Sequence, residues 1–291
     1  KAGADFGTPI ERLCHMNSPA IELYRQKGVD IEKEMLEIAL CAQHNNGGLS
    51  VDMWWQTDVK GLFAAGEAAG THGVYRPGGS ALNAGQVGSL RAAQYIAGHR
   101  NECPDETDFE KYAAEVFEDD LELAVKALSR ESNVSSLTLK ARRLMSEKGG
   151  AIRDGEKISE ALTETRLALE NFENTIGAAS RQELWEAFRL RDTLVSQLTY
   201  LSDMKYYIDK GGVSRGSYIC CDKKGIVPLG FDSSFSFSSP SSEKNPKVQE
   251  TSFDPKTLTC RTGERDVRPL PEGGGFFENV WRDYRQNKNI Y

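Results

Sequence analysis

The sequence predicts an α+β chain: a glycine-rich unit of strand, loop and helix, then a bundle of helices, then an irregular C-terminal segment. Three observations predict it. Residues 43–104 are rich in glycine and small apolar residues, residues 105–210 repeat apolar residues at helical spacing, and residues 211–291 lose that periodicity. Because 39% of its 291 residues are hydrophobic, the chain can bury a core.

Composition excludes several classes of protein. The chain has 36 Lys and Arg against 43 Asp and Glu, and a net charge of -7 argues against a non-specific binder of nucleic acid or anionic membranes. Its apolar runs are too short to cross a bilayer, and no leader opens it, so we expect a soluble, cytoplasmic protein. The six cysteines are scattered without a C-x-x-C pair, so we expect neither a metal site nor a disulfide framework. Cys220 and Cys221 are expected on one strand with side chains on opposite faces.

The first 42 residues are mixed. The segment IELYRQKG predicts a short helix that follows Ser18-Pro19 and stops at Gly28, whereas EKEMLEIALCA (32–42) fits a helix or a strand. The chain also opens without Met, directly in sequence punctuated by Gly and Pro, which is typical of the middle of a protein. We therefore expect a fragment of a longer chain.

The glycine-rich unit carries the strongest signal. GLSVDM (48–53) and GLFAAG (61–66) predict buried strands, and a helix is expected from Ser80, after Gly78-Gly79. One face of this helix carries only small residues: Ala81, Ala84, Gly85, Gly88 and Ala92. A glycine within a helix costs about 0.5–1 kcal/mol relative to alanine, so the stripe indicates a close approach. The helix N-terminus suits an anionic ligand, and the alternative is tight packing of the helix on a sheet.

Amphipathic periodicity predicts three or four antiparallel helices over residues 105–210, with a structural role. Thr107 with Glu110, and Ser180 with Glu183, form capping boxes that begin two of them. A shorter helix ends at Gly149-Gly150. The expected core residues are Phe109, Tyr112, Val116, Phe117, Leu137, Ala141, Leu144, Ile158, Leu162, Thr165, Leu169, Phe172, Ile176, Leu190, Leu194, Leu198 and Leu201.

After Gly211 the sequence predicts little regular structure. Residues 231–246 are rich in serine and are expected to form a loop. The tail is different: FENVWRDY (277–284) lies in a stretch whose aromatic residues fall on one side of a helical wheel. We expect that helix to dock on its own domain.

The run GLFAAGEAAGTHGVYRPGGSALNAGQVG (61–88) closely resembles the C-terminal FAD-binding signature of the succinate dehydrogenase and fumarate reductase flavoproteins. SRGSY (214–218) and the FENVWRDY ending resemble further segments of that family. The resemblance implies that residues 1–42 end a capping domain, 43–104 are the returning part of a Rossmann-like FAD-binding domain, and 105–210 are the helical domain. The family's dinucleotide fingerprint and its proton-donating arginine would lie upstream, so this chain would be a C-terminal fragment, inactive by itself.

The resemblance also implies site residues. Gly66 and Glu67 would meet the adenosine side of FAD, Ser80, Ala81 and Leu82 would face the pyrimidine edge of the isoalloxazine, and Arg76 would clamp a substrate carboxylate with its bidentate fork. Where the dicarboxylate enzymes have the histidine of H-x-x-x-G-G, this sequence has Gln43, followed by His44. Glutamine can donate a hydrogen bond but carries no charge. Fumarate, succinate, aspartate, urocanate, adenylylsulfate and steroid-like enones therefore all remain open as substrates.

The function that the resemblance implies is an FAD-dependent oxidoreductase of CH–CH groups, with hydride transfer between flavin and a carbon–carbon bond activated by a carboxylate. Its expected partners are the missing FAD-binding and capping domains, a small carboxylate substrate and an electron-transfer subunit. The alternative is a non-enzymatic helical interaction module, or a subunit of a larger redox complex.

Overall fold

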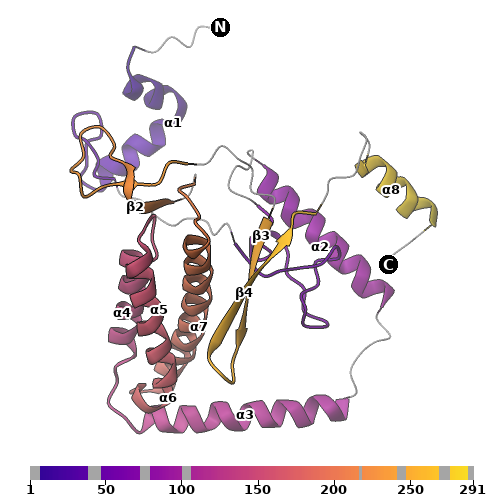
Figure 1. The fold of residues 1–291 in the computed structure, drawn as a ribbon. Coiled ribbons are helices and arrows are strands. Elements are labelled where there is room, and N and C mark those ends of the chain that lie inside the picture. The colour runs from indigo at the N-terminus through magenta and orange to yellow at the C-terminus, as the bar shows by residue number, and fades with distance from the viewer. Residues whose placement is uncertain are drawn as a thin grey trace. The chain divides into compact units, whose positions relative to one another are not determined.

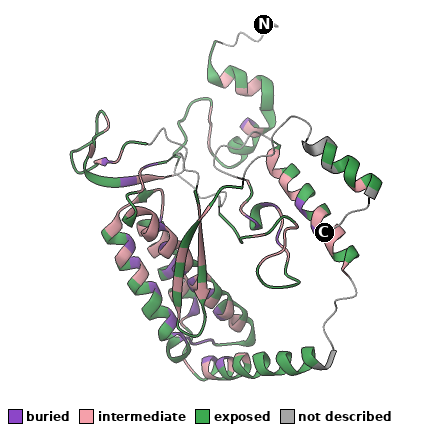
Figure 2. Ribbon diagram, turned by 45° about the vertical axis from the view of Figure 1, so that its right-hand side comes forward, coloured by how far each residue is buried: buried purple, intermediate pink, exposed green. Residues whose placement is uncertain are grey.

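The computed structural model describes residues 7–38, 47–72, 79–99, 106–215, 218–240, 247–268 and 276–287. The chain divides into two units, residues 1–44 and 45–291, which are described separately. Figure 1 shows the elements, and Figure 2 shows how far each residue is buried. No helix in the described ranges is long and apolar enough to cross a membrane.

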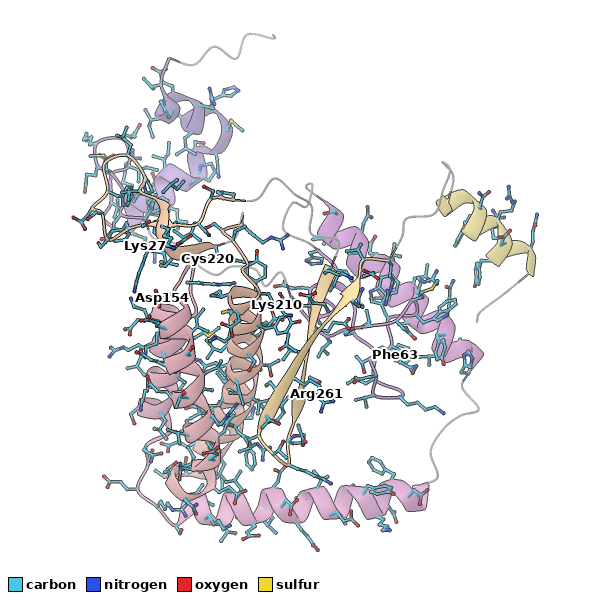
Figure 3. The ribbon with its side chains drawn as sticks, in the orientation of Figure 1. Lys27, Phe63, Asp154, Lys210, Cys220 and Arg261 are labelled. Atoms are coloured by element: carbon cyan, nitrogen blue, oxygen red, sulfur yellow. The ribbon has the colours of Figure 1, made fainter. Side chains whose placement is uncertain are left out.

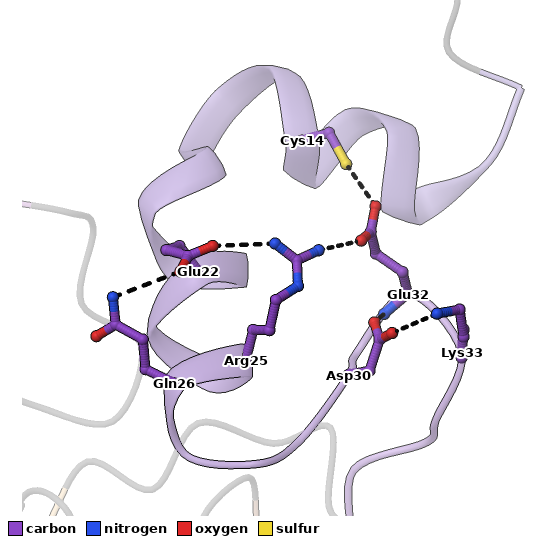
Figure 4. Close-up of polar contacts among 7 residues, drawn as sticks. All are labelled: Cys14, Glu22, Arg25, Gln26, Asp30, Glu32 and Lys33. Atoms are coloured by element: carbon purple, nitrogen blue, oxygen red, sulfur yellow. Dashed lines mark hydrogen bonds and ion pairs between the residues drawn. The ribbon is translucent and has the colours of Figure 1, made fainter.

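The first unit is built around helix α1 (Pro9–Gln26). Asn17 has non-helical φ/ψ and divides α1 into two helical segments at a kink. The segment after the kink, which contains Ser18-Pro19 and ends at Gln26, is the predicted short helix. The segment before the kink, begun by a capping box of Thr8 and Glu11, was not predicted. Arg25 joins Glu22 (2.9 Å) to Glu32 (2.6 Å) and ties the helix to the turn that follows Gly28 (Figure 4). Residues 32–38 form neither the helix nor the strand considered for them, and 39–42 lie outside the described residues.

The second unit contains the predicted helical bundle: α3 (Glu106–Leu128), α4 (Val134–Lys148), α5 (Gly155–Glu170), the short α6 (Phe172–Thr175) and α7 (Arg181–Asp209). α4, α5 and α7 pack against one another. Most of the residues predicted for their core are buried, and Ile158, Leu198 and Leu201 are fully inaccessible. Leu137, Leu144 and Leu162 are half-buried at the edge of the core. Ser180 caps α7, and α4 ends at Gly149, both as predicted.

The start of α3 differs from the prediction. Phe109, Tyr112, Val116 and Phe117 were expected in the core, yet each is more than 60% exposed. Thr107 was expected to precede the helix as its cap, but it lies within α3. Only the second half of α3 reaches the bundle, where Leu123 and Ala127 are buried. The apolar spacing predicted the helix correctly but could not say what it packs against.

The segment 211–291 is not irregular. β2 (Ile219–Ile226) pairs in parallel with β1 (Ile152–Arg153), and β3 (Lys247–Asp254) forms an antiparallel hairpin with β4 (Thr259–Asp266). The hairpin escaped prediction because polar cross-strand pairs stabilise it, such as Thr251 with Thr262 at 2.9 Å, and its strands lack apolar alternation. Helix α8 (Phe276–Asn287) forms at the predicted tail.

The two strands predicted in the glycine-rich unit do not form. Their segments pair with other residues only through isolated bridges, Gly48 with Ala69 and Gln56 with Phe63, and Leu49 and Met53 are exposed. A strand needs a ladder of backbone partners, and the described residues supply none here. Residues 66–68 form a short 3-10 helix, η1 (Gly66–Ala68), and the predicted helix α2 runs over Ser80–Gly98.

Candidate functional site

η1 lies against the second turn of α2 with two glycines in contact. Gly66 has φ +67°, a conformation that other residues rarely adopt, and a Cβ built on it would lie 3.4 Å from the Gly85 Cα. Thr71 closes the turn by donating its hydroxyl hydrogen to the Gly66 carbonyl at 3.3 Å. The backbone of the 66–70 turn therefore sits close to α2 without an intervening side chain.

Among the described residues, no side chain caps the N-terminus of α2. Its N-cap residue, Gly79, has φ +82°, and the first helical bond runs from the Asn83 amide to the Gly79 carbonyl at 3.2 Å. The first turn contains no acidic residue that would neutralise the positive end of the helix dipole. An anionic group placed before Ser80 would be stabilised there.

Trp55 is a functional candidate that the sequence interpretation missed. Its backbone has φ +63°, a strained conformation for a bulky residue. Asp52 holds the turn, since its Oδ1 accepts hydrogen bonds from the amides of Trp54 (2.7 Å) and Gln56 (3.0 Å). The buried Trp55 Nε1 has no acceptor among the described residues. The adjacent tryptophans at positions 54 and 55, shortly before GLFAAG, are the feature of the sequence that could have drawn attention to this residue.

An aromatic cluster supports the second half of α2. Tyr95 stacks on His99 with ring centroids 4.0 Å apart. The Tyr95 ring also lies 5.7 Å, centroid to centroid, from that of Phe63, which is labelled in Figure 3. Arg91 lies over the Trp54 ring at 4.2 Å and donates to the Met53 carbonyl at 2.9 Å. Burial lowers the pKa of Arg91. These contacts fix α2 relative to the 52–63 loop.

The β3–β4 hairpin connects the glycine-rich unit to the bundle. Glu250 accepts hydrogen bonds from Ser50 Oγ at 2.6 Å and Arg265 Nε at 2.5 Å, and Arg268 donates to the Val51 carbonyl at 2.6 Å. On the bundle side, Gln249 donates to the Asp203 carboxylate at 2.9 Å. Sequence analysis assigned the hairpin residues no role, because partners about 200 positions apart leave no local signal.

The SRGSY segment is anchored at the end of the bundle. Ser214 is buried and accepts a hydrogen bond from the Cys220 amide at 3.0 Å. The Arg153 guanidinium lies 3.8 Å over the Tyr218 ring, and burial lowers the pKa of this arginine. Burial, followed by a hydrogen bond with Tyr207, raises the pKa of Tyr218. Among the described residues, Ser214 and Tyr218 therefore pack this segment against β1 and β2.

The structure brings together five of the predicted site residues. Gly66 and Glu67 begin η1, and Ser80, Ala81 and Leu82 form the first turn of the adjacent α2. Glu67 and Leu82 are exposed, whereas Ser80 and Ala81 are half-buried. The substrate-binding candidates Arg76, Gln43 and His44 lie outside the described residues.

The arrangement fits a flavin dinucleotide. Glycines at 66 and 85 let the backbone of the 66–70 turn approach α2, so the turn that carries Glu67 lies beside the first turns of α2. The uncapped N-terminus of α2 suits the anionic edge of a reduced isoalloxazine, and the Glu67 carboxylate can accept hydrogen bonds from ribose hydroxyls. Among the described residues no group of His, Cys, Asp and Glu could hold a metal ion.

In comparison with known proteins, residues 11–82 match the FAD binding domain family. The chain is 50% identical over 66 residues to a fumarate reductase (CoM/CoB) subunit of Methanothermobacter marburgensis, an alignment that covers 22% of this chain and 12% of that protein. It is 29% identical over 150 residues to the fumarate reductase flavoprotein subunit of Helicobacter pylori, covering 50% and 21%. An L-aspartate oxidase of Pyrococcus horikoshii is 37% identical over 75 residues, covering 25% and 16%.

The fold resembles solved structures. A variant of the E. coli quinol fumarate reductase chain FrdA matches with a TM-score of 0.66 at 22% identity, covering 92% of this chain and 44% of that one. The chain thus spans less than half of that protein, and its alignments with the three curated relatives cover at most 21% of each.

Proposed function

Since this chain is a flavoprotein of the succinate dehydrogenase and fumarate reductase type, we propose that it forms part of an oxidoreductase that acts on a CH–CH bond beside a carboxylate. The observation that carries the proposal is the contact of Gly66 with Gly85 beside the uncapped start of α2. Gly66 and the first three residues of α2 lie within the matched FAD binding segment.

In the proposed complex, Gly66 and Glu67 bind the adenosine side of FAD. Ser80, Ala81 and Leu82 face the pyrimidine edge of its ring, where the α2 dipole favours the reduced, anionic form. Bound FAD supplies the capacity to accept or donate a hydride. The chain's own contribution is to hold the ring and to stabilise the charge that develops on it.

Arg76 is the proposed clamp for the substrate carboxylate, because a guanidinium offers two parallel donors to its two oxygens. Gln43 would donate a hydrogen bond to a second polar group, with His44 beside it. A neutral amide at position 43 binds a second carboxylate less strongly than a cation does. The proposal therefore covers small carboxylates in general, with fumarate and aspartate as the first substrates to test.

We also propose that these 291 residues are inactive alone. They contain no G-x-G-x-x-G fingerprint for the pyrophosphate of FAD, and no capping-domain arginine is recognised in them. The proposed partners are further FAD-binding and capping domains and an electron-transfer subunit, since two of the relatives are described as subunits.

The test uses a protein that contains this chain together with the complete FAD domain. Arg76→Ala should keep the flavin absorption spectrum and lower kcat/KM for the best carboxylate by roughly 100-fold or more, a loss typical of a charged hydrogen bond in a site. Lys111→Ala, an exposed cation on α3, is the control and should leave both unchanged. Unchanged kcat/KM in Arg76→Ala with every carboxylate would contradict the clamp.

A second candidate, an interaction module without catalysis, is favoured by one observation, the exposed aromatic residues of α3. It predicts that the complete protein holds no flavin. An apoprotein that fails to take up added FAD would support this alternative.

A further inference from the structure

The end of η1 is held by the backbone of residues 48–51. The Leu49 amide donates a hydrogen bond to the Ala68 carbonyl at 2.8 Å, and Gly48 forms a bridge with Ala69. The two backbones touch without a side chain between them, since a Cβ built on Gly48 would lie only 2.5 Å from the Ala68 carbonyl oxygen. A shift of residues 48–51 therefore shifts η1 as well.

The segment 48–51 has little apolar anchorage of its own. Leu49 is 53% exposed, and Ser50 is exposed as well. Two polar contacts from the C-terminal part of the chain reach the segment: Ser50 Oγ donates to the Glu250 carboxylate at 2.6 Å, and Arg268 donates to the Val51 carbonyl at 2.6 Å. The β3–β4 hairpin and the residue that follows it closely thus grip this segment.

The hairpin is itself fixed on the bundle. Gln249 and Thr251 of β3 both donate to the Asp203 carboxylate of α7, at 2.9 and 3.2 Å. Phe253, at the far end of β3, packs against the bundle core together with Leu258 and Cys260. The hairpin is therefore the anchored side of its contact with residues 48–51, and the segment is the side that is held.

We propose that the β3–β4 hairpin positions the turn that presents Glu67 to the adenosine ribose of FAD, with Ser50 and Arg268 as positioning residues. This inference rests on the proposed function, in which Glu67 binds that ribose. The contacts run from Asp203 of α7 through β3 and Ser50 to the end of η1, and each step is a hydrogen bond or the covalent chain. The helical bundle thereby fixes the place of a residue in the cofactor site.

The test measures the Kd of FAD by calorimetry, for a protein that contains this chain with the complete FAD domain, after removal of its flavin. Ser50→Ala with Arg268→Ala frees residues 48–51 from the hairpin and should raise the Kd about 10-fold, a loss expected of two hydrogen bonds. Ser252→Ala with Arg261→Ala makes the same changes at a cross-strand pair of exposed residues nearer the hairpin turn and should leave the Kd unchanged. Ser50→Thr keeps the hydroxyl group and should bind FAD as the wild type does.

A double-mutant cycle with Glu67→Ala shows whether the hairpin acts through Glu67. Glu67→Ala alone should raise the Kd about 10-fold, because the ribose loses a charged acceptor. Adding Ser50→Ala with Arg268→Ala should then raise it by only about 2-fold or less, since no ribose contact is left to position.

Three outcomes would overturn the inference: a full further 10-fold rise in the Glu67→Ala background, an unchanged Kd in the variant freed from the hairpin, or an equal loss in the Ser252 and Arg261 control. A wild-type protein that binds no FAD would instead contradict the proposed function on which the inference rests.

Discussion

Gly88 of α2 lies so close to the indole of Trp55 that a Cβ at position 88 would be 2.4 Å from Trp55 Nε1. Trp55 cannot easily retreat, because its carbonyl accepts a hydrogen bond from the Ala64 amide at 3.0 Å and its backbone is held in the left-handed region. The small residue predicted for close approach at position 88 is therefore required by packing within the chain. The same stripe faces the backbone at Gly66 one turn earlier.

Gly88→Ala should destabilise the fold by about 1–3 kcal/mol, since the added methyl group would overlap the indole of Trp55, whose backbone is held in place. Urea unfolding followed by tryptophan fluorescence measures the change. Gly85→Ala is the matched control on the same helix: its Cβ would lie 4.0 Å from the Gly66 Cα, an ordinary contact. Alanine there should be neutral or stabilise the helix by about 0.5–1 kcal/mol. Equal destabilisation by both substitutions would show that Trp55 is not the cause.

The helices of the bundle could be predicted from sequence because their stabilising residues recur locally. Ile158, Leu169 and Leu198 follow helical spacing, and the burial that this spacing predicts is found. Helical spacing does not show what an apolar helix face packs against. The apolar face of α3 that begins at Phe109 was therefore predicted to lie in the core, but it is exposed. For the same reason, the glycines at 85 and 88 indicated that something packs closely against this helix, but not that Gly66 and Trp55 do so.

The hairpin exposes a different limit of sequence reasoning. Its strands are stabilised by polar pairs across the ladder and by long-range bonds such as Ser50 to Glu250, neither of which leaves an apolar period of two. Of the candidate site, the helix that begins at Ser80 was predicted, whereas its contact with the 66–67 turn was not. The substrate residues Arg76, Gln43 and His44 remain predictions, because they lie outside the described residues.

Glu250→Gln should weaken the fold at neutral pH but not in acid. Burial alone would raise the pKa of Glu250, but the hydrogen bonds from Ser50 and Arg265 outweigh it and hold the pKa below the ordinary 4.5. A lowered folded-state pKa stabilises the fold above the unfolded value, and this contribution is lost as the pH falls through the folded-state pKa. Because the side chain is 37% exposed, we expect less than about 1 kcal/mol at pH 7.

Urea unfolding of both proteins near pH 7 and well below the pKa of Glu250 checks this pH dependence. Glu264→Gln removes an exposed carboxylate from the neighbouring strand of the same hairpin and is the matched control. A difference between wild type and Glu250→Gln that persists undiminished in acid would rule out ionisation of Glu250 as its source.

Thr165→Val should stabilise the bundle. The Thr165 side chain is 1% exposed, and its hydroxyl has no hydrogen-bond partner in the described structure. Valine has nearly the same shape and a similar helix propensity, so the change removes an unsatisfied buried hydroxyl worth about 1 kcal/mol. Thr165→Ser keeps the hydroxyl and deletes the methyl group, and it should destabilise by a similar amount. Thermal unfolding separates the two; a lower Tm for the valine variant would mean that the hydroxyl has a partner.

Cys220 and Cys221 should differ in their reaction with iodoacetamide, although they are neighbours. β2 turns the Cys220 side chain inward, where it is 3% exposed, and leaves Cys221 at the surface, as the alternation of a strand predicts. Burial raises the pKa of both thiols, so little thiolate is present at pH 7 and labelling should be slow and should quicken with rising pH. Fragment mass spectrometry after a timed reaction should find the label on Cys221 in the folded chain and on both residues in urea. Labelling of Cys220 at the same rate in the folded chain would mean that β2 opens readily, and the fixed pairing of Arg153 with Cys220 would then be wrong.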